Sequence, residues 1–419
     1  MRLDDYIEGL ESDEAARRRQ LVEEKSYAVV DYLEDVERRF DEVAQGDSLF
    51  GSTAPSIFVG RSNYPSVSAG VLSPVGDEEN AAAHETGPHW YRDDFTIDDV
   101  FRHRTSLLNS TRTTDVHAAD RWDGFVGVQR EVAIADRPVD VEIGLDGPLE
   151  VDLDVSVDDI ATPTGPRATA EHAELAENPY VPRPVKKTLE DDDWRAEGAM
   201  NYLYRRGFDV YDINTVLSAG ALGRGENRRL VPTRWSITAV DDAVSRFLRG
   251  QIRNARELSQ LEVWYNEFLA NRFWILLVPG QWEFELVEMK APGSIWNPDE
   301  DDYWVAVDRE GYEGRTGYVE ETAGAYYASK LGVLEHLKER DRQAKVLVLR
   351  EVTPDYWGPS GVWVIREAVR HAFDDHEFGT AESLGQALRT LEPVLPIDLA
   401  RLRRNSELAA GVQRTLGDF

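Results

Sequence analysis

The sequence predicts a mixed α and β protein of the α+β class, built from an N-terminal mixed domain, a smaller C-terminal α/β domain and a flexible C-terminal tail. Two observations predict this class. Some segments carry apolar residues at helical spacing, whereas others alternate apolar and polar residues with the period of a strand. Hydrophobic residues make up 42% of the 419 residues, which is enough for a sizeable core. A chain of this length is expected to form two domains.

The N-terminal part opens with a predicted helix and a short predicted strand. Leucines, valines and tyrosines recur every three or four residues over 10–46, which indicates an amphipathic helix. Residues 56–59 are an apolar run followed by a loop composition, which is typical of the end of a strand. Period-two alternation over 125–157, with Asp146 and Gly147 between its two arms, predicts a β-hairpin with a polar outer face.

The middle of the chain is expected to change from loop to helix to strand. Residues 160–190 mix prolines, alanines and acids without a period, so they predict a long surface loop or linker. Helical spacing returns over 194–206 and again over 239–268. Two β-like runs, 273–278 and 282–288, follow.

A turn-prone acidic segment at 297–302 marks the predicted main boundary. The predicted domains are therefore 1–296 and 297–405, followed by a tail over 406–419. Beyond the boundary the pattern predicts a strand over 303–307, a helix over 322–340, a buried strand over 345–350 and helices that begin near residues 364, 381 and 395.

The charge balance is typical of a salt-adapted surface. Acidic residues outnumber basic ones 78 to 47, which gives a formal net charge of -31, and lysine is rare next to arginine. In dilute buffer this charge repels nucleic acid, but in molar salt the Debye length falls to about 3 Å. DNA therefore stays a possible partner. The N-terminus carries acid where an export signal has a basic head and an apolar run, and no apolar run is long enough for a membrane helix, so we expect a cytoplasmic location and no membrane partner.

Several kinds of chemistry find no support in the residues. The chain has no cysteine, which excludes disulfides, thiolate zinc sites and cysteine nucleophiles. It has no Walker-type glycine loop, and its histidines lack the spacing of a metal site. No cofactor and no metal are therefore predicted.

Asp241 and Asp242 allow two interpretations. They follow an apolar run over 235–240, and two carboxylates at the end of a strand are suited to hold Mg²⁺ for phosphoryl chemistry. Aspartate at the N-terminus of a helix serves equally well as a cap. Both interpretations stay open at this point.

Two short segments combine arginine with an aromatic residue. Arg61 lies near Tyr64, and Arg234 precedes Trp235. Aromatic rings stack on nucleic-acid bases and guanidinium groups contact phosphates, so these four residues are candidate nucleic-acid or nucleotide contacts. The same residue types also occur in ordinary cores.

The last seven residues carry the most specific motif. Gln413 is followed at three-residue steps by Leu416 and by Phe419, where the sequence given ends. In a 3₁₀ turn positions i and i+3 lie above one another, so Leu416 and Phe419 would form one apolar plug beside the Gln413 amide. This pattern resembles the peptide that binds the replicative sliding clamp, PCNA. That peptide usually ends in two adjacent aromatic residues, whereas this chain has one; the alternative is a tail without a role.

Four internal segments extend the resemblance to nearly the whole chain. Residues 54–67, 232–242, 288–296 and 342–351 resemble the archaeal Nre family. With the clamp-type tail and the halophilic composition, the resemblance points to the NreA branch and implies DNA-damage repair alongside nucleotide excision repair and recruitment by PCNA. Many members begin with a cysteine cluster that looks like a zinc site, and this chain lacks it.

Two hypotheses about function follow. In the first, the folded body is a repair module tethered to PCNA through Gln413, Leu416 and Phe419. In the second, the chain is an enzyme in which the loop of Arg61 and Tyr64 meets the segment 234–242 and acts on nucleic acid or NAD. Such an enzyme would be a nuclease or a nucleotidyl or ADP-ribosyl transferase.

Overall fold

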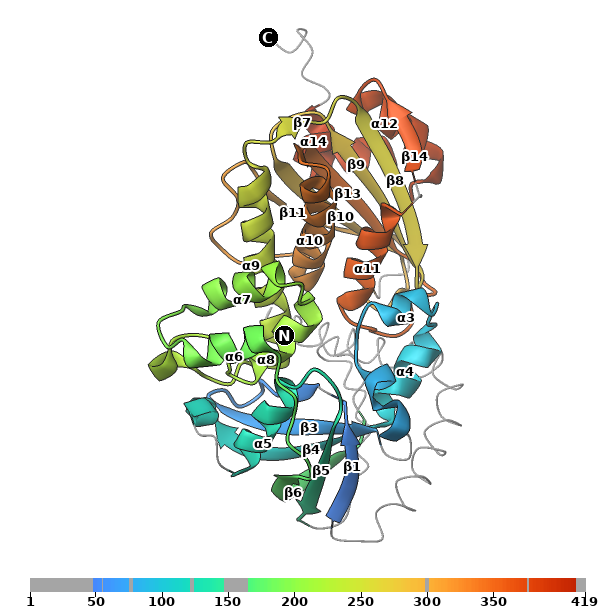
Figure 1. The fold of residues 1–419 in the computed structure, drawn as a ribbon. Helices are drawn as coiled ribbons and strands as arrows, with labels where there is room; N and C mark the ends of the chain where they lie inside the picture. Colours follow the sequence, from blue (N-terminus) through green and yellow to red (C-terminus); the bar gives the residue numbers. More distant parts are fainter. Residues whose placement is uncertain are drawn as a thin grey trace, which may run out of the picture. The chain divides into compact units, whose positions relative to one another are not determined.

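The computed structural model describes the chain over residues 48–54, 56–74, 78–120, 124–146, 165–297, 301–374 and 377–411. Helices and strands occur throughout these residues (Figure 1), so the mixed α+β class is confirmed. The helix predicted over 10–46 lies outside the described residues, as do Gln413, Leu416 and Phe419.

The described chain divides into two compact units, 48–244 and 245–411, with the division inside helix α9 (Thr233–Ile252). We call them the N-terminal unit and the C-terminal unit. The boundary predicted near 297 does not coincide with this division, because a single sheet of the C-terminal unit takes strands from both sides of it.

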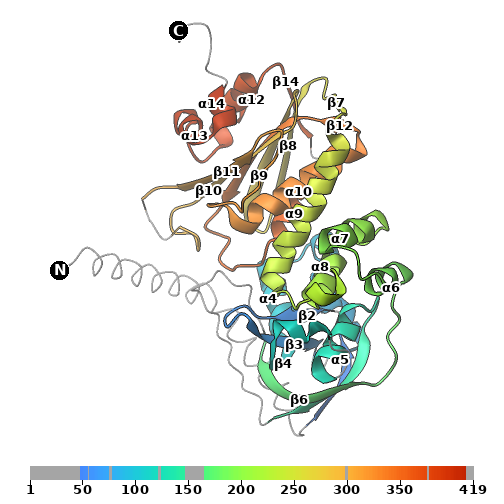
Figure 2. The same ribbon diagram turned by 90° about the vertical axis from the view of Figure 1, so that its left-hand side faces the viewer.

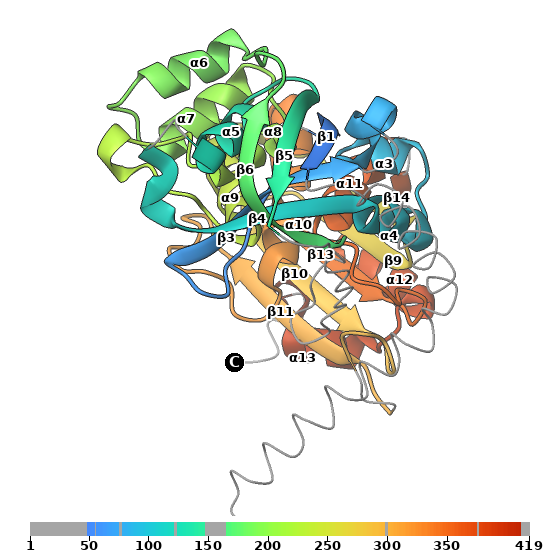
Figure 3. The ribbon, with the colours of Figure 1, turned by 90° about the horizontal axis from the view of Figure 1, so that it is seen from below.

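The N-terminal unit contains a six-stranded sheet in the order β1-β5-β6-β4-β3-β2. Only β4 and β6 pair in parallel, and the other neighbours are antiparallel. Helix α5 (Gly124–Ala133) lies against this sheet (Figure 3), and its apolar residues join those of the strands in one core. The strands are β1 (Ser48–Thr53), β2 (Ile57–Val59), β3 (Ser66–Pro74), β4 (Leu107–Asp115), β5 (Val139–Leu145) and β6 (Arg167–Leu175).

Three strands of this sheet test the sequence predictions. The strand predicted over 56–59 is confirmed as β2. The alternation predicted from residue 125 is wrong over its first part, which is helix α5, and the first arm of the predicted hairpin is β5. The second arm lies outside the described residues, and β5 pairs with β1 and β6. The surface loop predicted over 160–190 is wrong, because β6 and a helix occupy much of it. The buried positions of β6 are filled by alanines, whose small side chains give only a weak alternation signal.

Short helices complete the N-terminal unit. The helix predicted over 194–206 is confirmed as α7 (Ala196–Arg205). Two others begin at capping boxes, in which Thr96 and Asp209 accept from the backbone of the first turn. These two are α4 (Ile97–Thr105) and α8 (Val210–Ser218). The other short helices are α3 (His89–Arg92) and α6 (Arg183–Glu190), with 3₁₀ turns at η1 (Glu78–His84), η2 (Val116–Asp120) and η4 (Gly225–Asn227).

The C-terminal unit contains a second six-stranded sheet, in the order β11-β10-β13-β9-β8-β14. β10 and β13 are parallel neighbours, and every other pair is antiparallel. A further two-stranded pair joins β7 (Arg256–Glu257) to β12 (Arg342–Gln343). The sheet strands are β8 (Leu261–Phe268), β9 (Asn271–Val278), β10 (Glu283–Lys290), β11 (Trp304–Glu310), β13 (Lys345–Val352) and β14 (Glu377–Ala381).

Helices cover both faces of this second sheet (Figure 2). One face carries α10 (Ala323–Glu339) and α11 (Trp363–Ala372). The other carries three helices whose leucines and alanines pack into one core with the strands. They are α12 (Leu384–Leu391), α13 (Leu399–Asn405) and α14 (Glu407–Ala410), and Leu391 is followed by the 3₁₀ turn η5 (Glu392–Val394).

Most predicted elements of the C-terminal unit are confirmed, with one clear error. The helix predicted over 239–268 ends at Ile252, and its second half is strand β8. Because helices lie on both faces of the sheet, β8 is largely buried on both faces, polar residues such as Glu262 and Asn266 included, and it lacks the alternation that identifies a strand. The segments confirmed are the strands predicted at 273–278, 282–288, 303–307 and 345–350 and the helices predicted at 322–340 and 364.

The start of the predicted tail belongs to the folded unit. Ser406 caps α14 by accepting from the Ala409 amide at 3.0 Å. The Glu285 carboxylate of β10 accepts from the Leu408 amide at 2.9 Å, which attaches this short helix to the sheet. The tail predicted from residue 406 is therefore wrong for its first residues, and the helices predicted from 381 and 395 begin at Leu384 and Leu399.

A half-buried histidine makes the stability of the C-terminal unit depend on pH. The His336 ring stacks on Phe373 with 3.9 Å between ring centroids. Burial first, and then the charge of Arg340, lower the pKa of His336 from 6.5 to about 4, although Glu262 and Asp374 oppose this shift. As the pH falls below 6.5, His336 is therefore protonated in the unfolded chain, whereas in the folded chain it stays neutral until about pH 4.

We expect the free energy of unfolding to fall by up to about 3 kcal/mol, from this group alone, as the pH drops through that window. His336→Gln is expected to flatten this part of the profile in denaturant titrations at several pH values. His172→Gln, at an exposed position on β6, is the control and should leave it unchanged. A profile equally steep in His336→Gln would contradict the assignment.

Candidate functional site

Four of the six candidate residues come together in the N-terminal unit. Arg61 and Tyr64 lie in the loop between β2 and β3, and Arg234 and Trp235 lie in the first turn of α9. The rings of Tyr64 and Trp235 are in contact, with 5.2 Å between centroids and an angle of 53° between planes. Each ring is 45% exposed. We call these four residues the arginine–aromatic patch.

Hydrogen bonds bring the loop to the start of α9. The Val59 amide, at the end of β2, donates to the Thr233 hydroxyl at 2.9 Å. Immediately after it, the Gly60 amide donates to the carbonyl of Ser68 at 2.7 Å and closes the base of the loop. A turn inside the loop is closed by the Tyr64 amide, which donates to the carbonyl of Arg61 at 3.2 Å. The loop is therefore held at both its base and its tip.

The first turn of α9 is fixed from the inside of the unit. The Trp235 amide donates to the carbonyl of Pro232 at 2.8 Å. Ser236 is buried, and its hydroxyl donates to the Asn214 side chain of α8 at 2.5 Å. Because successive residues of a helix point 100° apart, this buried serine directs Arg234 and Trp235 toward the surface.

The electrostatics of the patch favour an anion. Burial and the neighbouring Arg234 lower the pKa of the Arg61 guanidinium below its ordinary value. Both arginines also lie near the N-terminus of a 20-residue helix, which is the positive end of its dipole. Two cations beside a helix N-terminus, with two exposed rings, can bind a negatively charged planar ligand.

Asp241 and Asp242 are not part of this surface. The run over 235–240 is helical, so both aspartates lie in the interior of α9, neither at a strand end nor at a helix N-terminus. Asp241 is only 1% exposed. Both interpretations of this pair are therefore wrong in their structural premise, because the run that suggested a strand winds around the first turns of a long helix.

The structure also contains a buried polar network that the sequence analysis missed. On β11, the Glu310 carboxylate accepts from Lys330 at 3.1 Å and from the Trp282 indole at 3.0 Å. All three side chains are buried. The only signal in the sequence was a group of charged residues at the end of the predicted strand.

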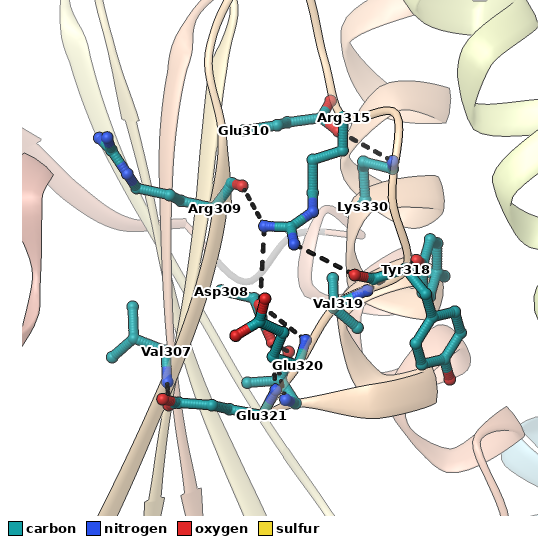
Figure 4. Close-up of polar contacts among 12 residues, drawn as sticks. Val307, Asp308, Arg309, Glu310, Arg315, Tyr318, Val319, Glu320, Glu321 and Lys330 are labelled. Atoms are coloured by element: carbon teal, nitrogen blue, oxygen red, sulfur yellow. Dashed lines mark hydrogen bonds and ion pairs between the residues drawn. The ribbon is translucent and has the colours of Figure 1, made fainter.

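A second carboxylate of β11 closes the loop that leads into α10 (Figure 4). Asp308 accepts from the successive amides of Glu320, Glu321 and Thr322 at 3.2, 3.0 and 2.8 Å. Burial opposes its ionisation, but these hydrogen bonds hold the pKa of Asp308 below its ordinary value. In the same loop Arg315 donates to two backbone carbonyls, so this network stabilises the fold.

A third network lies at one end of β10 and β13. Arg350 is hydrogen bonded to the Glu288 carboxylate and donates twice to the Asn271 side chain, at 3.0 and 2.6 Å. Lys290 lies 3.5 Å from the other oxygen of Glu288 and 4.1 Å from the ring centroid of Trp304. Because the charges of Glu288, Arg350 and Lys290 are buried and face one another, we assign this network to the fold as well.

Among the residues that the structure describes, no group of three or more histidine, aspartate or glutamate side chains is arranged to hold a metal ion. No helix in the same parts of the chain has both the length and the apolar composition needed to cross a membrane. The arginine–aromatic patch is thus the surface feature with the clearest binding chemistry.

Two family models cover most of the chain. The model described as archaeal Nre, N-terminal matches residues 21–297, and the model described as archaeal Nre, C-terminal matches residues 310–419. No solved structure matches the chain.

Three relatives are similar along most of their length. The DNA repair protein NreA of Haloferax volcanii is 65% identical over 100% of both chains. The DNA repair protein NreA of Archaeoglobus fulgidus is 37% identical over 80% of this chain and 82% of its own. The DNA repair protein NreB of the same organism is 34% identical over 90% and 93%.

Proposed function

The chain belongs to the archaeal Nre family, and from this premise we propose that it acts in DNA repair. The observation that carries the proposal is the 65% identity, over the full length of both chains, to a protein named DNA repair protein NreA. The other two relatives carry the same description of their role. We place this role in the cytoplasm and alongside nucleotide excision repair.

The proposal includes recruitment by the sliding clamp PCNA through Gln413, Leu416 and Phe419. Supporting it, the C-terminal family segment extends to residue 419 and so includes these three positions. The folded unit is described as far as Gly411, two residues before Gln413. A clamp bound so close to the folded body would raise the concentration of that body at DNA under synthesis or repair.

Phe419→Ala is expected to weaken binding to PCNA by at least about 30-fold, the effect of removing an interface residue that contributes about 2 kcal/mol. The phenylalanine ring is half of the apolar plug, whereas the Asp418 side chain is outside the i and i+3 positions. Titration calorimetry of the full chain at high salt, with Asp418→Ala as the matched control, measures the difference. Equal affinities of Phe419→Ala and the unchanged chain would contradict the tether.

The same variant tests the link to nucleotide excision repair. Cells that carry Phe419→Ala should become more sensitive to DNA cross-linking agents, and loss of an excision nuclease should add nothing further. Additive sensitivity would place the protein outside that pathway.

The alternative function, an enzyme acting on nucleic acid or NAD, is only partly supported. The convergence of Arg61 and Tyr64 with Arg234 and Trp235 favours contact with a nucleotide. Asp241, which that hypothesis needed in the same cleft, is buried inside α9. The geometry therefore supports binding at this surface more than catalysis.

A further inference from the structure

We propose that the arginine–aromatic patch binds single-stranded DNA, with bases stacked on Tyr64 and Trp235 and phosphates held by Arg61 and Arg234. This inference names a ligand for the proposed repair role. Only the choice of DNA rather than RNA rests on that role. The binding chemistry itself follows from the geometry of the four side chains.

The two rings are exposed together although burial would stabilise them. Large aromatic side chains gain about 1.5–3 kcal/mol from full burial, so an exposed pair in contact is a feature of binding surfaces. The angle of 53° between the ring planes shows that Tyr64 and Trp235 are not stacked face to face. Ring surface therefore stays available to a planar ligand.

The platform is rigid before any ligand arrives. The loop is attached to α9 by the Val59–Thr233 hydrogen bond, and the first turn of α9 is attached to α8 by the Ser236–Asn214 bond. Binding to side chains that are already positioned costs less conformational entropy than ordering a mobile loop. A pre-ordered pair of rings is suited to stack on bases.

The charges of the patch complement phosphate. Arg234 lies in the first turn of α9, where a cation opposes the helix dipole and an acidic residue is favoured. Arg61 is close enough for Arg234 to lower its pKa. In a chain with a net charge of -31, two arginines held together at such a position favour an anionic ligand.

The combination selects an unpaired strand. In a duplex the faces of the bases are covered by their neighbours, whereas unpaired bases stack on aromatic side chains. Inorganic phosphate or an acidic peptide would use the two arginines but leave the rings without a role. Single-stranded DNA uses both.

Binding of a fluorescent oligo-dT of about 12 nucleotides to the full chain tests the proposal by fluorescence anisotropy. Trp235→Ala and Tyr64→Ala are each expected to weaken binding by at least about fivefold, because stacking contributes about 1–3 kcal/mol per base. Trp235→Phe, which keeps a ring, should retain most of the affinity. Tyr180→Ala is the matched control, because Tyr180 is 56% exposed in the same unit and has the Arg137 guanidinium 5.8 Å from its ring.

The salt dependence of DNA binding distinguishes the contribution of the two arginines from that of the two rings. Each phosphate contact to a single strand contributes about -0.7 to the slope of log K against log salt. The double variant Arg61→Gln with Arg234→Gln should therefore show a slope shallower by about 1.4 between about 0.2 and 2 M KCl. Trp235→Ala should weaken binding without changing the slope.

Three results would overturn the inference. They are an equal loss in Tyr180→Ala, tighter binding of a duplex of the same length, and competition by polyglutamate as effective as that by unlabelled oligo-dT. The last result would identify an acidic protein as the ligand.

Two checks keep the test independent of folding and of the tether. Thermal unfolding of each variant shows whether it is folded. If Trp235→Ala does not fold, Tyr64→Ala, which lies in the exposed loop, still tests the contribution of stacking to DNA binding. PCNA affinity is expected to stay unchanged in all patch variants. DNA affinity therefore tests the single-stranded DNA surface, and PCNA affinity separately tests the clamp tether.

Discussion

Lys330→Met is expected to lower the free energy of unfolding by about 3–5 kcal/mol, which is the usual cost of removing one partner from a buried ion pair. Lys330 lies 3.1 Å from the Glu310 carboxylate, and both are buried between α10 and β11. Methionine nearly preserves the volume of the side chain but leaves the Glu310 charge, in a medium of low polarity, with only the more distant Arg249 guanidinium, 3.8 Å away, as a cationic partner. Chemical denaturation of the full chain measures the change.

A double-mutant cycle identifies the cause of that loss. Glu310→Gln keeps an oxygen for the Trp282 indole, which donates to Glu310 at 3.0 Å, and removes the charge. If the loss of compensation for the Glu310 charge is the cause, the double variant Lys330→Met with Glu310→Gln should lose clearly less stability than the sum of the single variants. Lys345→Met is the control, because the Lys345–Glu283 pair is similarly short, at 2.6 Å, but partly exposed. A loss no larger than in Lys345→Met would contradict the prediction.

Glu288→Leu is expected to cost a similar amount, about 3–5 kcal/mol. Its carboxylate lies between Arg350 and Lys290, so its removal leaves two buried cations on neighbouring strands without it. These two cations then repel one another across the parallel pair β10 and β13. This repulsion should destabilise the pairing of these two strands, which are covered by helices on both faces of the sheet.

The same strand supplies the matched control. Glu283 begins β10, and its ion pair with Lys345 is 32–39% exposed. Glu283→Leu should therefore cost less than about 1 kcal/mol, as exposed ion pairs usually do. Equal losses in Glu283→Leu and Glu288→Leu, measured by denaturant titration, would show that burial does not set the strength of this network.

Local patterns predicted many of the elements, and their failures have a common cause. The helix over 322–340 and the strand over 345–350 were predictable because each is rich in apolar residues over a length typical of its element, long for the helix and short for the strand. Strand β8 was mistaken for helix because it is buried on both faces. Strand β6 was missed because alanines fill its buried positions. In each case the burial that defines the element is provided by residues distant in sequence.

The sequence by itself determined what depends on residue identity: the family, the acidic composition, and the spacing of Gln413, Leu416 and Phe419 that predicts a clamp-binding peptide. Only the tertiary structure decided which candidate residues share a surface. Arg61 and Tyr64 meet Arg234 and Trp235 because a hydrogen bond joins positions 174 residues apart, whereas Asp241 is turned into the core by the helix that carries it. Spacing along a chain sets directions within one element, but contacts between elements follow from packing, which minimises exposed apolar surface over the whole unit.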